Sequence, residues 1–177
     1  MSRLSASALD VPLQLFVGDV LDAARFQPPK NPPSPIYVPK PRGGLWTSTW
    51  LGNQYGSAWV QWCLGEDFCV PDDGMWNCTV LRPALDARVF VVDCRADLEF
   101  LVEDSTITDS IGGVYPDFEK IATRYDAIRL TKKGMRATRS PLLDSNLWGW
   151  DVESTLWLAW KFSEMVPIGH RTFPRIP

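Results

Sequence analysis

The most aromatic stretch of the chain reads GWDVESTLWLAW and spans residues 149–160. Its run of Trp, Leu and Val is typical of a strand buried within a sheet. Two carboxylates, Asp151 and Glu153, lie at the start of this run. Because side chains alternate along a strand, residues two apart share a face, so both acids are predicted to point to one side. Their Trp neighbours would keep them poorly hydrated, which suits either a reactive carboxylate or an ion pair with Arg129, Lys132, Lys133 or Arg136.

Short strands and short helices are predicted over the rest of the chain. Runs of β-branched and aromatic residues predict strands over 13–19, 45–50, 75–83, 87–94 and 127–131. Apolar residues at helical spacing predict helices over 57–68, 95–104 and 115–126, and one or two helical turns over 19–26 that begin at Asp19. Strands and helices do not alternate regularly, which favours an α+β fold over a doubly wound parallel sheet.

The 177 residues are expected to form one domain, 1–177, with a core over 12–160. Seven of the fifteen residues from 27 to 41 are proline, which predicts an extended surface connection. A ligand for a proline-reading domain is the alternative for this segment. Residues 132–146 are predicted to be a polar, basic loop, and residues 161–177 a C-terminal tail.

Charge and rare residues exclude several classes of function. A net charge of −3 and a pI near 5.1 argue against a broad grip on nucleic acid. A single histidine, His170, argues against most His-dependent triads and metal centres. The cysteines form no CxxC pair, so no metal is expected and four buried thiols are the simplest prediction, with zinc binding or disulfides as the alternatives; they are Cys63, Cys69, Cys78 and Cys94. No apolar stretch is long enough to span a bilayer and no signal peptide is recognised, so a cytoplasmic location is expected.

A second candidate for chemistry is GGLWTST, residues 43–49. Ser48 lies between Thr47 and Thr49, and hydroxyl groups on a strand can orient a neighbouring carboxylate or bind a ligand. Gly43 and Gly44 would allow a tight turn or the close approach of a ligand. The alternative is that Thr simply favours strands. Neither GxxxxGK[ST] nor GxGxxG occurs in the chain.

Five blocks of sequence, taken in order, resemble a family of small bacterial and phage proteins with the ADP-ribosyltransferase-like fold. The resemblance extends over residues 12–160, and its blocks are KPRGGLWTSTW, WVQWCLGEDF, VFVVDCRADLEFL, DFEKIATRYDAIRLT and GWDVESTLWL. It implies a split core of two small, mainly antiparallel sheets around a cleft for NAD. It also implies that the protein uses NAD as a substrate, cleaves the nicotinamide–ribose bond and transfers ADP-ribose to an unknown acceptor, for example a host protein.

The resemblance also implies roles for individual residues. Glu153 is the key carboxylate, because a fixed negative charge stabilises the cation that develops on the ribose. Ser48 is expected to hold Glu153, and a Trp of the GGLWTSTW block is expected to stack on nicotinamide. The residues expected to bind NAD are Gly44, Trp46, Thr47, Thr49, Trp50 and Asp151.

The chain departs from the family pattern at its first strand. That family carries an Arg or His there, whereas LQLFVGD has neither, and the nearest basic residues are Arg25, Lys40 and Arg42. Either another group binds NAD, or the chain is a catalytically inactive binding or inhibitor protein that retains the fold. The nine Trp residues leave a third hypothesis, a Trp-lined module for carbohydrate or nucleic acid.

Overall fold

Strands and short helices are mixed along the chain in the computed structural model, which describes residues 11–140 and 146–177. The strands are β1 (Gln14–Val17), β2 (Leu45–Gly52), β3 (Gly56–Ser57), β4 (Trp76–Pro83), β5 (Val89–Val92), β6 (Thr106–Thr108), β7 (Val114–Pro116), β8 (Ala127–Leu130), β9 (Ser154–Trp157) and β10 (Phe162–Arg171). The helices are α1 (Ala58–Glu66), α2 (Arg95–Val102), α3 (Phe118–Arg124), α4 (Lys132–Thr138) and a 3-10 turn at Ala23–Arg25. The predicted α+β class is confirmed.

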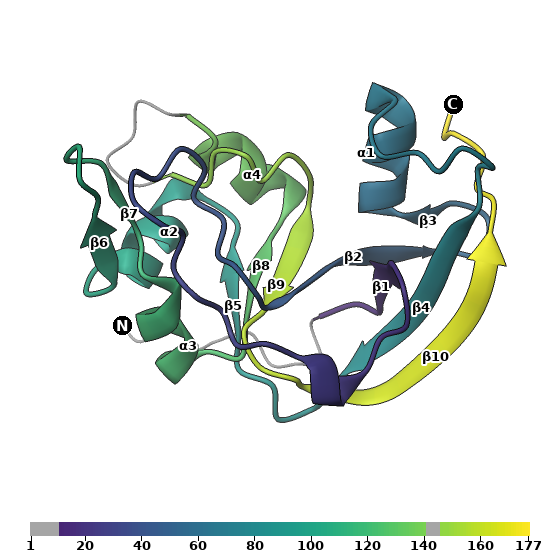
Figure 1. The fold of residues 1–177 in the computed structure, drawn as a ribbon, viewed down its shortest axis with the longest axis horizontal. Helices are drawn as coiled ribbons and strands as arrows, with labels where there is room; N and C mark the ends of the chain where they lie inside the picture. Colours follow the sequence, from purple (N-terminus) through teal and green to yellow (C-terminus); the bar gives the residue numbers. More distant parts are fainter. Residues whose placement is uncertain (1–10, 141–145) are drawn as a thin grey trace.

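One bent sheet carries most of the strands, in the order β10-β4-β1-β2-β9-β8-β5, with β3 paired to β2. The pairing is antiparallel except between β5 and β8. β6 and β7 form a separate small hairpin. The expected two sheets are joined through β2, because residues 45–47 pair with β9 while Ser48 and Thr49 pair with β1. Figure 1 shows β2 running between two halves of the molecule.

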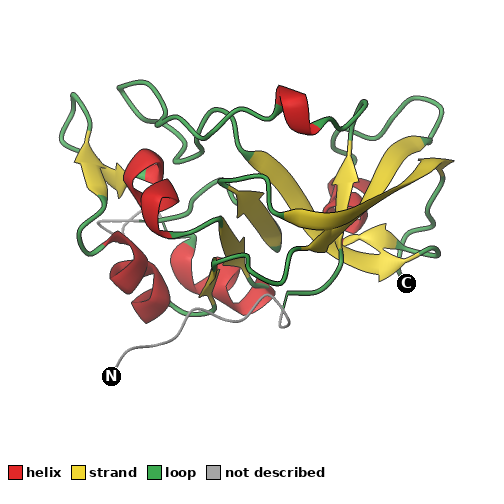
Figure 2. Cartoon of the chain, turned by 90° about the horizontal axis from the view of Figure 1, so that it is seen from below, coloured by secondary structure: helices red, strands yellow, loops and turns green. Residues whose placement is uncertain are grey.

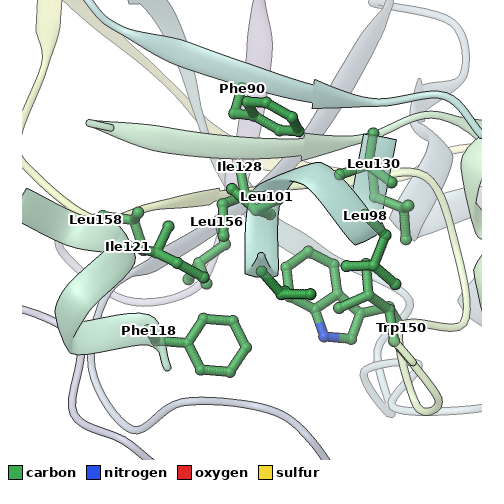
Figure 3. Close-up of a cluster of buried hydrophobic side chains, with 13 residues drawn as sticks. Phe90, Leu98, Leu101, Phe118, Ile121, Ile128, Leu130, Trp150, Leu156 and Leu158 are labelled. Atoms are coloured by element: carbon green, nitrogen blue, oxygen red, sulfur yellow. The ribbon is translucent and has the colours of Figure 1, made fainter. Parts of the chain in front are cut away.

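Each half has its own cover. The helices α2, α3 and α4 lie around β5, β8 and β9, whereas α1 stands over the half formed by β1, β4 and β10 (Figure 1). Figure 2 shows the same division from below, with most helices at one end and the long strands at the other. The core of the first half centres on Trp150, which stacks against Phe118 and is 1% exposed (Figure 3). An aromatic side chain buries about 150–250 Å² in such a site, so this part of the Trp content is explained by packing.

The predicted basic loop at 132–146 is wrong over its first half, where α4 forms. Thr131 begins this helix by accepting a hydrogen bond from the Gly134 N–H. Gly134 resembles a helix breaker in the sequence, but its lack of a side chain lets α4 lie directly on the end of β5. A Cβ at this position would lie 2.0 Å from the Val92 carbonyl oxygen. Residues 141–145 lie outside the described part of the chain.

The predicted tail is also wrong, because residues 162–171 form β10, the longest strand. β10 pairs with β4 along its whole length, and its register shifts between Phe162 and Glu164 and between Pro167 and Gly169. Pro and Gly disguise this strand in the sequence, but both are tolerated at the edge of a sheet, where bulges are common. Phe173, just beyond the strand, is buried against the α1 half of the core.

Several elements are shorter than predicted, including the following three. The strand expected over 149–160 is limited to β9, so Asp151 and Glu153 precede it. The helix expected over 115–126 begins only at Phe118, because Asp117 is its N-cap and Pro116 belongs to β7. The helical turns expected after Asp19 are the single 3-10 turn, which is capped by Asp22.

Candidate functional site

A cleft of about 430 Å³ lies where β1, β2 and the segment before β9 meet. Its volume is within the range of roughly 300–1,000 Å³ that small-molecule sites occupy. Its lining is mainly apolar, with a few polar groups, which is the usual chemistry of a ligand pocket. We name it the Trp46 cleft. Its lining residues are Leu15, Phe16, Val17, Lys40, Gly44, Leu45, Trp46, Thr47, Ser48, Trp59, Trp150, Asp151, Val152 and Ser154.

Aromatic rings form the walls of the Trp46 cleft. Trp46 and Trp150 meet edge to face, with ring centroids 4.5 Å apart and an interplanar angle of 73°. Trp59, at the start of α1, lines the cleft and stacks on Trp62. Such walls suit a flat ring, because offset and edge-to-face contacts between rings are favourable.

The polar groups of the cleft come from β2 and from the approach to β9. Ser48 is buried, and its Oγ accepts a hydrogen bond of 3.1 Å from the Trp59 N–H, which ties β2 to the first turn of α1. Ser154 opens β9, and Asp151 lies three residues before it at the cleft wall. The Asp151 carboxylate is partly exposed and pairs with Arg139 Nη2 at 3.2 Å.

Lys40 is the basic residue among the described residues that line the cleft. Its Nζ lies 5.7 Å from the centre of the Trp46 ring, over its face. Burial lowers the pKa of the Lys40 ammonium, and the negative charge of Asp151 opposes this shift. The cleft therefore combines aromatic walls, the hydroxyl groups of Ser48 and Ser154, one carboxylate and one cation.

Glu153 lies outside this set. Its carboxylate accepts hydrogen bonds from Thr49 Oγ1 at 2.6 Å and Thr49 N at 3.2 Å, and it pairs with Arg129 Nη2 at 3.2 Å. Because consecutive strand residues point to opposite faces, Thr49 and Glu153 lie on the face away from Ser48. The ion-pair role considered for the acidic pair is the one this geometry shows, with Arg129 as the partner of Glu153.

The structure therefore separates residues that the sequence grouped together. The expected contact between Ser48 and Glu153 is wrong, because Thr49 makes that contact instead. Trp50 packs edge to face on Phe173 and lines a different, smaller pocket. The expected shared face for Asp151 and Glu153 is also wrong: the first lines the cleft and the second does not. The predicted residues that do line the cleft are Gly44, Trp46, Thr47, Ser48 and Asp151.

Gly44 has a structural reason to be glycine. Its φ is +67°, and a Cβ there would lie 2.9 Å from the Trp157 carbonyl oxygen. Thr47 likewise serves the core: its Oγ1 accepts a hydrogen bond from Trp157 Nε1 and donates one to the buried Gln14. The two residues shape the floor of the cleft through the backbone.

The sequence missed Lys40 as a residue of the cleft, together with Trp59, Trp150 and Ser154. No local signal marks Lys40, because it belongs to the proline-rich segment and enters the cleft through long-range contacts. Ser154 had a usable signal, since an antiparallel pairing of 43–49 with the start of the last strand would have set it beside Ser48.

Cysteines and membrane spans add no further site. Cys63 and Cys78 are buried as predicted, but Cys69 is exposed and Cys94 half-buried; all four are free thiols. Burial raises the pKa of the Cys63 thiol to about 12, so it is inert as a nucleophile. Over residues 11–140 and 146–177, no cluster of potential metal ligands occurs and no helix could cross a membrane.

No protein-family model, curated protein or solved structure matches this chain.

Proposed function

We propose that the protein binds NAD in the Trp46 cleft and transfers its ADP-ribose to an acceptor. The observation that carries this proposal is the meeting of Ser48, Ser154 and Asp151 around an aromatic space at the junction of β2 and β9. The sequence resemblance to ADP-ribosyltransferase-like proteins implies site residues in these two stretches. The nicotinamide ring suits the wall formed by Trp46, and the ribose suits the hydroxyl groups on the floor.

The chemistry requires a carboxylate beside the ribose. When the bond between C1′ and the nicotinamide nitrogen breaks, its electron pair leaves with nicotinamide and positive charge develops on the sugar. A fixed carboxylate in a water-poor cleft stabilises that charge. The acceptor's nucleophile then forms the new bond at C1′ and loses its proton. Asp151 is the carboxylate that lines the cleft, so the proposal gives it the role that the resemblance implied for Glu153.

Glu153 becomes a positioning residue in this proposal. By holding the backbone and hydroxyl of Thr49, it fixes the distance between β2 and the approach to β9. Arg129 neutralises its charge on the face away from the cleft. The carboxylate pair thus has divided roles, with Asp151 facing the substrate and Glu153 supporting the floor.

Nicotinamide release tests the proposal. Wild type, Asp151→Asn and Glu153→Gln would each be incubated with NAD, and free nicotinamide would be quantified per folded molecule. We expect Asp151→Asn to lower the rate by about 100-fold or more, as loss of one charge-stabilising group does. We expect folded Glu153→Gln to retain most of its rate. The reverse pattern would return the role to Glu153, and no release by wild type, even with host lysate as a source of acceptors, would contradict the transferase.

A second candidate function is NAD binding without turnover, as a binding or inhibitor protein. It is favoured by one observation, the engagement of Glu153 with Arg129 and Thr49, which removes this carboxylate from the cleft. Calorimetry separates the two candidates, because a binding protein would give only the heat of NAD binding and would release no nicotinamide. Transfer would instead consume the titrant.

A further inference from the structure

The proline-rich segment 27–41 is fastened to the molecule along its length. Asn31 bonds to the N-terminus of α3, donating to Asp117 and accepting from the Phe118 N–H, each at 2.8 Å. Further along, the Ile36 N–H donates to Asp109 Oδ2 at 2.9 Å. A segment expected to be a surface connection is therefore held in one place and delivers its last residues to the cleft.

Lys40 is positioned by the end of this segment. The Pro39 carbonyl accepts a hydrogen bond of 3.1 Å from the indole N–H of the buried Trp150, and the Lys40 N–H donates to the Val38 carbonyl at 2.8 Å. Gly149 has a φ of +87°, and a Cβ on it would lie 2.7 Å from Val38 Cγ1, so the two segments touch closely. These contacts fix the Lys40 backbone at the cleft wall beside Trp46.

The ammonium of Lys40 has unused capacity to bind an anion. A lysine ammonium has three donors. Among the described residues the Lys40 ammonium forms no ion pair, and it lies over the Trp46 ring. Asp151, the nearby acid, is already paired with Arg139. The group of Lys40, Asp151 and Arg139 thus carries one net positive charge at the wall of a mainly apolar cleft.

We propose that Lys40 is the anion-binding residue of the Trp46 cleft and holds a phosphate group of the nucleotide ligand. This inference rests on the proposed function for the identity of the ligand. A half-buried lysine loses part of its hydration. An anionic ligand compensates for this loss with charge-assisted hydrogen bonds. A nucleotide joins such an anion, its phosphate group, to a flat ring, and the Trp46 cleft provides for both parts.

Matched ligands that differ by one phosphate ester test this inference. Nicotinamide mononucleotide with nicotinamide riboside, and AMP with adenosine, would be titrated into wild type, Lys40→Met and Lys40→Arg by calorimetry. In wild type we expect the phosphorylated member of at least one pair to bind more tightly by about tenfold or more, as a charge-assisted contact provides. Lys40→Met should abolish that difference and Lys40→Arg should restore it. Lys30→Met is the matched control, because Lys30 belongs to the same segment but pairs with Glu119 outside the cleft.

The outcomes separate this inference from the proposed function. If wild type prefers the phosphorylated ligands and Lys40→Met keeps that preference, another residue binds the phosphate and the inference is wrong. Wild type that binds none of the four ligands also overturns it. Nicotinamide release from NAD, measured on the same samples, reports on the proposed function alone, so release that persists in Lys40→Met with unchanged KM would leave the transferase intact and remove Lys40 from its site.

Discussion

At the scale of single residues, Arg129 and Glu153 form an ion pair that is nearly removed from solvent, with side-chain exposures of 14% and 11%. Removing one partner of a buried pair leaves the other charge uncompensated and typically costs about 3–5 kcal/mol. We expect Glu153→Gln and Arg129→Met each to lower the free energy of unfolding by an amount of this order. The double variant should lose clearly less than the sum of the two.

Urea denaturation of the four proteins in this double-mutant cycle measures the coupling. Additive losses would show that the two side chains stabilise the fold independently. Arg129 Nη1 is buried and lacks a hydrogen-bond partner among the described residues. Arg129→Met removes this atom in the single and in the double variant alike, so its contribution cancels from the coupling energy.

Sequence reasoning at this scale did not predict the partners of the two acids. Asp151 and Glu153 were expected within the strand over 149–160, yet β9 begins only at Ser154 and both acids precede it. The residues before Ser154 therefore lack the regular side-chain alternation of a strand, and Asp151 and Glu153 do not share a face. Which hydroxyl meets Glu153 depends on the register between β2 and β9, and a shift of one residue exchanges Ser48 for Thr49.

At the scale of elements, two helix glycines should respond oppositely to alanine. Gly134 lies on β5, and a Cβ there would collide with the backbone at Val92, whereas Gly65 in α1 has only the end of the Arg175 side chain, 3.7 Å from such a Cβ. We expect Gly134→Ala to destabilise the protein strongly, because backbone must move. Gly65→Ala should be neutral or stabilising by up to about 1 kcal/mol, the intrinsic advantage of alanine in a helix. Thermal unfolding followed by circular dichroism compares the two.

The contrary result, with Gly134→Ala as stable as wild type, would mean that α4 can move away from β5 without loss. Elements with strong periodic signals, such as α1, α2 and β4, were predicted from the sequence with nearly the correct bounds. Elements that depend on contacts with residues distant in the sequence were not predicted. α4 forms where Gly134 can pack closely against the end of β5, and β10 forms by pairing with the edge of β4.

At the scale of the whole molecule, acidic side chains hold the proline-rich segment in place. The Ile36 N–H lowers the pKa of Asp109, and the Asn31 N–H lowers the pKa of Glu119, while slight burial opposes both shifts. A lowered carboxyl pKa stabilises the folded state fully above the unfolded value of about 4. That stabilisation is lost as the pH falls through the lower folded value.

We therefore expect acid to loosen the proline-rich segment below about pH 4. NMR titration of the Ile36 and Asn31 amides measures this directly, since each should shift with a midpoint below that of a free carboxylate. Asp109→Asn and Glu119→Gln should remove the respective transitions. Amides that do not respond until the whole protein unfolds would show that the segment is held in place without the charges of Asp109 and Glu119.

The cleft itself could not be predicted, since its lining extends from Leu15 to Ser154 in the sequence and only the sheet brings these segments together. Composition and pattern predicted the α+β class and several elements of the cleft. The bend in the sheet, the fastening of the proline-rich segment and the entry of Lys40 follow from long-range contacts that leave no local trace.

The pairing of β2 with both β9 and β1 has one mechanical consequence. The cleft has no hinge loop at its base, because its floor is a strand hydrogen-bonded to β9 in one half and to β1 in the other. The two walls of the cleft cannot move apart without bending β2 and breaking its hydrogen bonds to β1 or β9. The stiffness of the sheet therefore limits the width of the cleft. A ligand that is too wide would have to deform the sheet in order to enter, whatever the side chains that line the cleft.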